Sequence, residues 1–273
     1  MGNFLSLKAT SVCMAAFVVA GFVASNASAV PDLDAHEIMK NNFFVSKILS
    51  MKSDATMVLT NDKGQIRERK ISTLSRLQKN GMDSELVMKF NAPADIKGIG
   101  FLQIEHIDED DDQWIYLPAL KKSRRLVANN KKDSFMGSDF SYGDFARPKV
   151  DLYRHTVLKS EVLNGQDCYV IESLPRDDAI RNDNGYSKKI TWVRKDNFLE
   201  AQVKYYDLVG QLLKTQVVTD HKLVEPKNQR WFALRREMNN HQTEHKTVLS
   251  FEHLEAGVPA PESLFTTRNI ERE

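Results

Sequence analysis

The stretch VLKSEVLNGQDCYVIES, residues 157–173, is the most informative about the fold. Two runs rich in valine, leucine, isoleucine and tyrosine flank Asn164-Gly165. This dipeptide favours the two positive-φ positions of a type I′ turn. We therefore predict an antiparallel hairpin of strands 157–163 and 166–173.

The same pattern of apolar runs and intervening turns continues through most of the chain. From about residue 53, short β-branched and aromatic runs alternate with polar turns such as Asn61-Asp62-Lys63-Gly64. This spacing is typical of all-β proteins. Trp231-Phe232-Ala233-Leu234 is apolar on both strand faces, as expected where a sheet is covered on both sides or curves around an apolar interior. The candidate strands are 55–60, 65–73, 84–90, 98–106, 113–117, 124–128, 157–163, 166–173, 188–194, 199–206, 211–221, 230–238 and 246–254.

One helix is expected before the strands. Asp34 precedes Glu37 by three residues, as in a capping box, and Leu33 and Ile38 are placed to form a hydrophobic staple. Apolar residues then continue at roughly helical spacing to about Ser50. The fold class is therefore mostly β, or α+β, with an N-terminal helix.

The N-terminus has the features of a secretory signal peptide. Lys8 precedes an apolar run at 12–23, and Ala27-Ser28-Ala29 supplies a small-x-small cleavage site. The run is too short to span a bilayer, which needs about 20 residues. We predict a signal peptide at 1–29, one domain at 30–273 without a transmembrane segment, and a periplasmic location.

The amino-acid composition limits the classes of function that the chain can have. The chain has 273 residues, 41% of them hydrophobic, with 38 Lys+Arg and 37 Asp+Glu. It can therefore bury a large core, and its balanced charge argues against nucleic acid as a partner. Cys168 is the only cysteine after residue 29, and its apolar strand-like surroundings predict a buried structural thiol.

No motif predicts catalysis, a metal or a cofactor. His241-Gln242-Thr243-Glu244-His245 fits the H-x-x-E-H pattern of zinc peptidases, but that chemistry needs a helix, and strand-like runs flank this segment. We predict a hairpin loop here. The acidic run 108–112 lacks the pattern of a calcium loop and is expected to be a solvated tip. The basic cluster at 121–132 either meets head groups or an acidic partner, or simply faces this acidic run.

Residues 129–151 are the least regular part of the chain, with aromatic residues among glycine, serine and aspartate. Such a loop in a sheet protein is either a functional lid or a crossover whose aromatic side chains plug one end of the sheet. Both alternatives remain open from the sequence.

A family resemblance emerges from this central region. The segment Trp114-Ile115-Tyr116-Leu117-Pro118-Ala119-Leu120, then Arg124-Arg125, then Phe135-Met136-Gly137-Ser138-Asp139-Phe140 with Tyr142 and Asp144, resembles the bacterial outer-membrane lipoprotein-sorting proteins. These belong to the superfamily of the periplasmic lipoprotein carriers LolA and LolB. Asp95-Ile96-Lys97-Gly98 and Lys214-Thr215 support the resemblance, which covers roughly residues 34–272.

The resemblance implies a strongly curved, incomplete antiparallel β-barrel with a helical or loop lid, whose concave side accepts acyl chains. The expected cavity wall or lid residues are Trp114, Tyr116, Phe135, Met136, Phe140 and Phe145. Residues expected to hold the lid by ion pairs, or to meet a head group, are Arg124, Arg125, Asp139 and Asp144. The aromatic members could equally serve only to close the fold.

Three function classes follow. The leading hypothesis is a periplasmic carrier of lipidated protein or lipid, moving cargo toward the outer membrane between an inner-membrane exporter and an outer-membrane acceptor. The alternative is a sensor or interaction module of the cell envelope with the same fold, which should expose an edge or patch for a protein partner. An enzyme would need a cluster of perturbed titratable groups, which the sequence does not supply.

Overall fold

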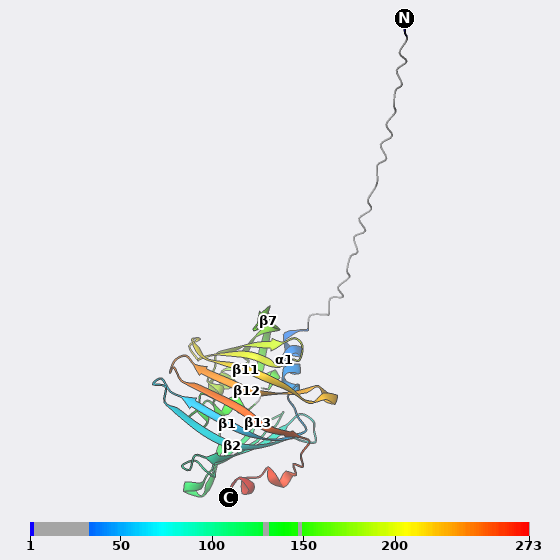
Figure 1. Ribbon diagram of the computed structural model, residues 1–273. Helices are drawn as coiled ribbons and strands as arrows, with labels where there is room; N and C mark the ends of the chain where they lie inside the picture. The colour runs from blue at the N-terminus through cyan, green and yellow to red at the C-terminus, as the bar shows by residue number, and fades with distance from the viewer. Residues whose placement is uncertain (3–32, 128–130, 147–148, 273) are drawn as a thin grey trace. The chain divides into compact units, whose positions relative to one another are not determined.

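A single sheet of thirteen strands dominates the structure, a computed structural model that describes residues 1–2, 33–127, 131–146 and 149–272. Every neighbouring pair is antiparallel, in the order β6-β5-β4-β3-β2-β1-β13-β12-β11-β10-β9-β8-β7. Among the described strands, β6 and β7 pair on one side only, so the sheet curves without closing (Figure 1). The strands are β1 Ser50–Thr60, β2 Ile66–Leu77, β3 Ser84–Ala92, β4 Gly100–Ile104, β5 Asp112–Leu117, β6 Lys122–Leu126, β7 Tyr153–Leu163, β8 Gln166–Pro175, β9 Lys188–Arg194, β10 Glu200–Tyr206, β11 Leu212–Glu225, β12 Arg230–Asn240 and β13 Lys246–Ala256.

The predicted strands are confirmed, each overlapping one strand of the sheet. The turn at Asn164 and Gly165 has φ values of 50° and 78°, as a type I′ turn requires, and Leu163 pairs with Gln166 across it. Most predicted strands are too short at one or both ends. The sheet extends them into polar residues because backbone pairing with neighbouring strands does not depend on side-chain polarity.

The predicted helix begins as expected but ends earlier. Asp34 caps α1 (Ala35–Phe44) by accepting a hydrogen bond from the Glu37 backbone N–H at 2.8 Å. The carbonyl of Phe44 accepts from the Arg230 guanidinium, and the carbonyl of Val45 accepts from the Trp231 backbone N–H. These contacts with β12 replace the continuation of the helix toward residue 50.

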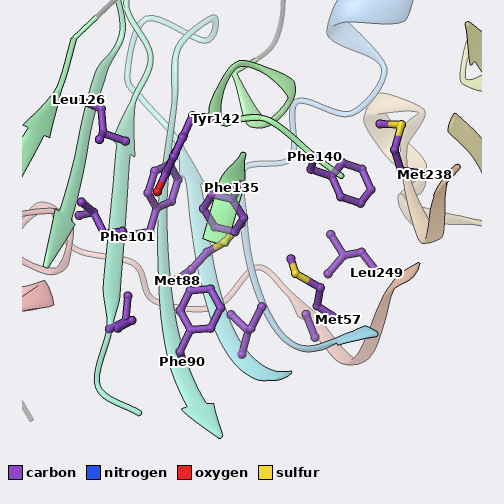
Figure 2. Packing of buried hydrophobic residues seen from close by; sticks show 14 of the residues in the cluster. Met57, Met88, Phe90, Phe101, Leu126, Phe135, Phe140, Tyr142, Met238 and Leu249 are labelled. Atoms are coloured by element: carbon purple, nitrogen blue, oxygen red, sulfur yellow. The ribbon is translucent and has the colours of Figure 1, made fainter. Parts of the chain in front are cut away.

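The chain crosses from β6 to β7 through residues 131–146, which we call the lid segment. It contains two short helical turns, η3 (Phe135–Gly137) and α2 (Tyr142–Phe145), and η4 (Val150–Leu152) follows it. Phe135 is fully buried, and its ring centroid lies 5.2 Å from that of Phe101 on β4. Figure 2 shows Phe135 and Phe140 reaching from this segment toward strand side chains, including Met57 and Leu249. An incomplete barrel with a loop lying over its concave face is therefore confirmed.

The outer face of the sheet is covered at one end by the C-terminal segment. The short helix α4 (Thr267–Ile270) buries Ile270 against Leu102, Val87 and Phe265. A Cβ on Gly100 would lie 2.8 Å from the Ile270 Cβ, so glycine is required for this close approach. The remaining α-helix of the described chain, α3 (Asp178–Asn184), connects β8 to β9, and short 3-10 turns lie at η1 (Pro118–Leu120), η5 (Pro226–Asn228) and η6 (Glu262–Leu264).

Two further predictions concern the cysteine and the leader. Cys168 is a fully buried free thiol, as predicted. The predicted signal peptide at 1–29 lies almost wholly outside the described residues, whereas the described residues between 33 and 272 belong to one compact unit. No helix in the described part of the chain has the length and hydropathy needed to cross a membrane.

Candidate functional site

A cavity of about 270 Å³ lies between the concave face of the sheet, α1 and the lid segment. Its volume is close to the lower end of the range for small-molecule sites, about 300–1,000 Å³. Apolar side chains from β1, β3, β12, β13 and the lid segment form one part of the wall, with the charged residues Glu85, Arg236 and Asp144 among them. The apolar side chains there are Met51, Leu86, Met88, Phe140, Phe145, Phe232, Leu249 and Phe251.

The opposite part of the wall, on β7, β9 and β10, is aromatic and cationic. Lys189 is 9% exposed, and its Nζ lies 5.8, 5.1 and 5.2 Å from the ring centroids of Tyr153, Tyr186 and Tyr205. Burial lowers the pKa of Lys189 from 10.5 to about 8. Burial also raises the pKa of each of the three tyrosines, so their rings stay neutral and present π faces to the ammonium.

Asp144 connects the lid segment to the sheet beneath it. Its carboxylate accepts a hydrogen bond from Lys214 Nζ on β11 at 2.6 Å and one from the Tyr186 hydroxyl at 3.0 Å. Lys214 also donates to the backbone carbonyl of Asp139 at 2.8 Å. Burial alone would raise the pKa of Asp144, but Lys214 and Lys189 hold it below its ordinary value. The lid segment is therefore held by a buried ion pair with side-chain exposures of 1% and 5%.

The other charged side chains of the cavity wall are paired within the protein. Arg236 Nη1 lies 2.8 Å from Glu200 Oε1, and Asn42 on α1 donates to the second oxygen of Glu200 at 3.1 Å. Arg76 pairs with Glu85 at the rim. Of the lysine and arginine residues that line the cavity in the described chain, Lys189 alone has no carboxylate within ion-pair distance.

The structure brings most of the predicted aromatic residues together. Phe140 and Phe145 line the cavity, and Phe135 and Met136 pack behind them in the main core. The Phe135 ring centroid lies 4.3 Å from that of Phe145. These side chains thus both close the fold and form the cavity wall, so the two interpretations of the aromatic loop are not exclusive.

Trp114 and Tyr116 are not among the lining residues. They lie on the outer face of β5 and pack against the cluster that contains Phe265 and Ile270. Ile115, between them, points into the main core. The expectation that the two share a strand face is correct. The expectation that this face is the concave one is corrected, because alternation along a strand does not say which face is which.

The predicted ion pairs of the lid also need correction. Arg125 binds Asp112 on the neighbouring strand rather than an aspartate of the lid segment. Asp139 accepts a hydrogen bond from Thr247 at 2.7 Å, and Asp144 pairs with Lys214. Arg124 is exposed on β6. Basic residues of the 121–132 cluster do face the acidic run, since Lys131 Nζ lies 2.9 Å from Asp110.

The histidine motif is a hairpin loop, as predicted. Residues 241–245 connect β12 to β13, and His241 is within 2.8 Å of the Thr215 hydroxyl. Among the described residues, no group of three or more histidine, cysteine or acidic side chains is placed to hold a metal ion.

Sequence reasoning missed Lys189, Tyr153, Tyr186 and Tyr205 as a cluster. Tyr153 lies on β7, Lys189 on β9 and Tyr205 on β10, Tyr186 lies just before β9, and only the strand order brings them together. A weak signal was present: Lys189 interrupts the inward-facing positions of a strand that continues with the buried residues Thr191 and Val193.

Known proteins with this geometry identify the family. A family model described as an uncharacterized protein matches residues 82–272. An outer membrane lipoprotein-sorting protein domain from Vibrio parahaemolyticus superposes with a TM-score of 0.80 and 32% identity, covering 87% of this chain and 98% of that one. A DUF1329 family protein from Desulfovibrio piger gives 0.79 and 27%, covering 86% and 97%.

A LolA superfamily protein from Nitrosomonas europaea shares the fold, with a TM-score of 0.66, 19% identity and coverage of 86% and 99%. A search of the curated proteins finds no match. These three matches cover 98%, 97% and 99% of the solved chains, so the fold is shared over nearly their whole length. The chain belongs to the family of outer-membrane lipoprotein-sorting proteins.

Proposed function

We propose that this protein is a periplasmic carrier that binds the acyl chain of a lipid or lipoprotein and moves it toward the outer membrane. The observation that carries the proposal is the cavity beneath the lid segment, whose wall includes the apolar side chains of Met88, Phe140, Phe145 and Leu249. Burying a methylene group is worth about 0.8 kcal/mol, so such a wall binds acyl chains without special polar chemistry. The lipoprotein-sorting relative from Vibrio parahaemolyticus supports a lipid-linked role.

The proposal includes a transport route between the two membranes. The predicted signal peptide at 1–29 would deliver the protein to the periplasm, where an inner-membrane exporter would supply the cargo and an outer-membrane acceptor would receive it. The lid segment would shield the acyl chain in transit and open at either membrane.

Purification from an envelope fraction tests the proposal. We expect an acylated species to co-purify in near-stoichiometric amount and to be identified by mass spectrometry after extraction. Leu86→Trp should reduce the bound amount about tenfold, because the larger ring takes the space of at least two methylenes of ligand. Leu120→Trp is the matched control, since Leu120 is 64% exposed and outside the cavity wall. An empty wild-type protein would contradict the proposal.

The Trp114→Ala variant tests whether Trp114 contributes to folding or to acyl binding. Trp114 packs on the outer face, so we expect the free energy of unfolding to fall by about 2 kcal/mol while acyl binding stays within twofold of wild type. Urea unfolding and titration with a fluorescent fatty acid measure the two effects. A tenfold loss of binding with unchanged stability would instead mean that Trp114 contacts the ligand.

One observation favours the alternative function as an interaction module. β7 is an edge strand, and Val157, Leu158 and Val162 on it are 39%, 48% and 67% exposed. An exposed apolar edge strand can pair with a partner's strand. A protein that purifies without lipid but retains a stable protein partner through β7 would support this alternative.

A further inference from the structure

We propose that Lys189 and its three tyrosines form the binding position for the anionic oxygen group of an acyl ligand, a carboxylate or a phosphate. This inference rests on the proposed acyl-binding function and specifies the class of cargo. A ligand of this kind would place its charged end at Lys189 and its chain along the apolar wall of β12, β13, β1 and β3.

The hydrogen-bonding capacity of the Lys189 ammonium supports an anionic ligand. An ammonium group carries three donors. In the described chain, its surroundings supply the faces of three aromatic rings, but no side-chain carboxylate within ion-pair distance. Cation–π contacts stabilise the charge without satisfying the donors. A buried charged group that lines a cavity and retains its donors is suited to an anionic acceptor.

The charge balance around Lys189 also favours an anionic ligand. Asp144 is the nearest carboxylate network, but it already binds Lys214 and Tyr186. Glu200 is bound by Arg236 and Asn42. Lys189, Lys214 and Arg236 therefore face two carboxylates, which leaves this part of the cavity with one excess positive charge.

The cationic and the apolar parts of the cavity wall lie apart along the sheet. β9 and β13 are four strand spacings apart, or about 19 Å along the sheet. Lys189 on β9 and the apolar pair Leu249 and Phe251 on β13 line the same cavity. The cavity is thus amphipathic, cationic at one part of its wall and apolar at another, as a fatty-acid-like ligand requires.

The test compares four ligands that share a dodecyl chain: dodecanoate, dodecyl phosphate, dodecanol and dodecyltrimethylammonium. Binding to the wild-type protein, after removal of co-purified lipid, is measured by equilibrium dialysis below the micellar concentration. We expect the anions to bind about 10- to 100-fold more tightly than dodecanol, and the cation more weakly than dodecanol. The preference between the two anions distinguishes a free fatty acid from a phosphate-bearing lipid.

Lys189→Met tests the residue directly. It should reduce affinity for the two anions by about 10- to 100-fold and leave dodecanol within twofold. Lys188→Met is a matched control, because Lys188 is the adjacent residue on β9 and pairs with Glu172 at 3.1 Å instead of lining the cavity. It should leave all four affinities unchanged.

Lys189→Met is also expected to fold. Burial lowers the pKa of Lys189 to about 8, so the charged form opposes folding. The unfolded wild-type protein binds more protons between pH 8 and the ordinary value of 10.5, and wild-type stability therefore rises with pH across this interval. The variant should lack that rise and should melt at or above the wild-type temperature at pH 7.

The outcomes separate the two proposals. Equal binding of the anions and dodecanol, unchanged in Lys189→Met, would overturn the anionic site and leave acyl binding intact. Failure of all four ligands to bind the wild-type protein would overturn acyl binding itself, and the anionic site with it. Even without a folded variant, equal binding of the anions and dodecanol to the wild-type protein would overturn the anionic site.

Discussion

Asp144→Asn is expected to destabilise the protein by about 3–5 kcal/mol, a large fraction of the 5–15 kcal/mol typical of folded domains. Asp144 is fully buried and receives hydrogen bonds from Lys214, Tyr186 and the backbone N–H of Ser141. Asparagine can keep the contact with Ser141. It cannot balance the Lys214 ammonium, which would remain buried without a counter-charge. Urea unfolding followed by circular dichroism measures the loss.

Asp144→Asn/Lys214→Met is the control for this prediction. Removing both charges should recover most of the lost stability, since a buried ion pair often contributes little more than apolar residues of similar size. A single variant within 1 kcal/mol of wild type would show that the pair does not hold the lid segment.

The same carboxylate predicts an acid limit of stability. The pKa of Asp144 is depressed below its ordinary value of 3.8 in the folded protein. Its contribution is therefore present above pH 3.8 and is lost as the pH falls through the depressed value. The lid segment should consequently release before the sheet at low pH, since this ion pair connects the two.

The strands could be predicted because their signals are local. Turn chemistry at Asn164 and Gly165, and period-two alternation in strands such as β13, depend only on neighbouring residues. The family resemblance added the curvature and the lid, which alternation alone does not provide. The end of α1 could not be predicted, because contacts from Arg230 and Trp231 determine it.

Some residues of the site could be predicted from local sequence, and others could not because contacts between distant segments bring them together. Phe140 and Phe145 could be proposed because a dense aromatic loop is unusual in itself. The partner of Asp144 is Lys214, 70 residues later, and only the strand order places β11 below the lid segment. Arg125 was the expected partner, but it binds Asp112 across a strand pair.

Phe135→Ala should be the most destabilising single core change in the lid segment, by about 3–5 kcal/mol. Phe135 is fully buried, and its ring meets those of Phe90, Phe101, Tyr142 and Phe145 at centroid distances of 6.1, 5.2, 5.3 and 4.3 Å. Truncation removes these contacts and leaves a cavity that the two strands beneath it cannot fill. Figure 2 shows the ring between Tyr142 and Met88.

Amide hydrogen exchange in the Phe135→Ala variant distinguishes a lid segment that opens from one that stays closed while the sheet is folded. If the lid segment can open while the sheet stays folded, Phe135→Ala should first increase amide hydrogen exchange in residues 131–146, with strand amides still protected. Phe135→Leu, which keeps most of the volume, should show a smaller effect, of about 1.5 kcal/mol or less. Exchange that rises equally in the lid segment and in β3 and β4 would instead mean that the segment unfolds only with the sheet, so that cargo could not enter by its release.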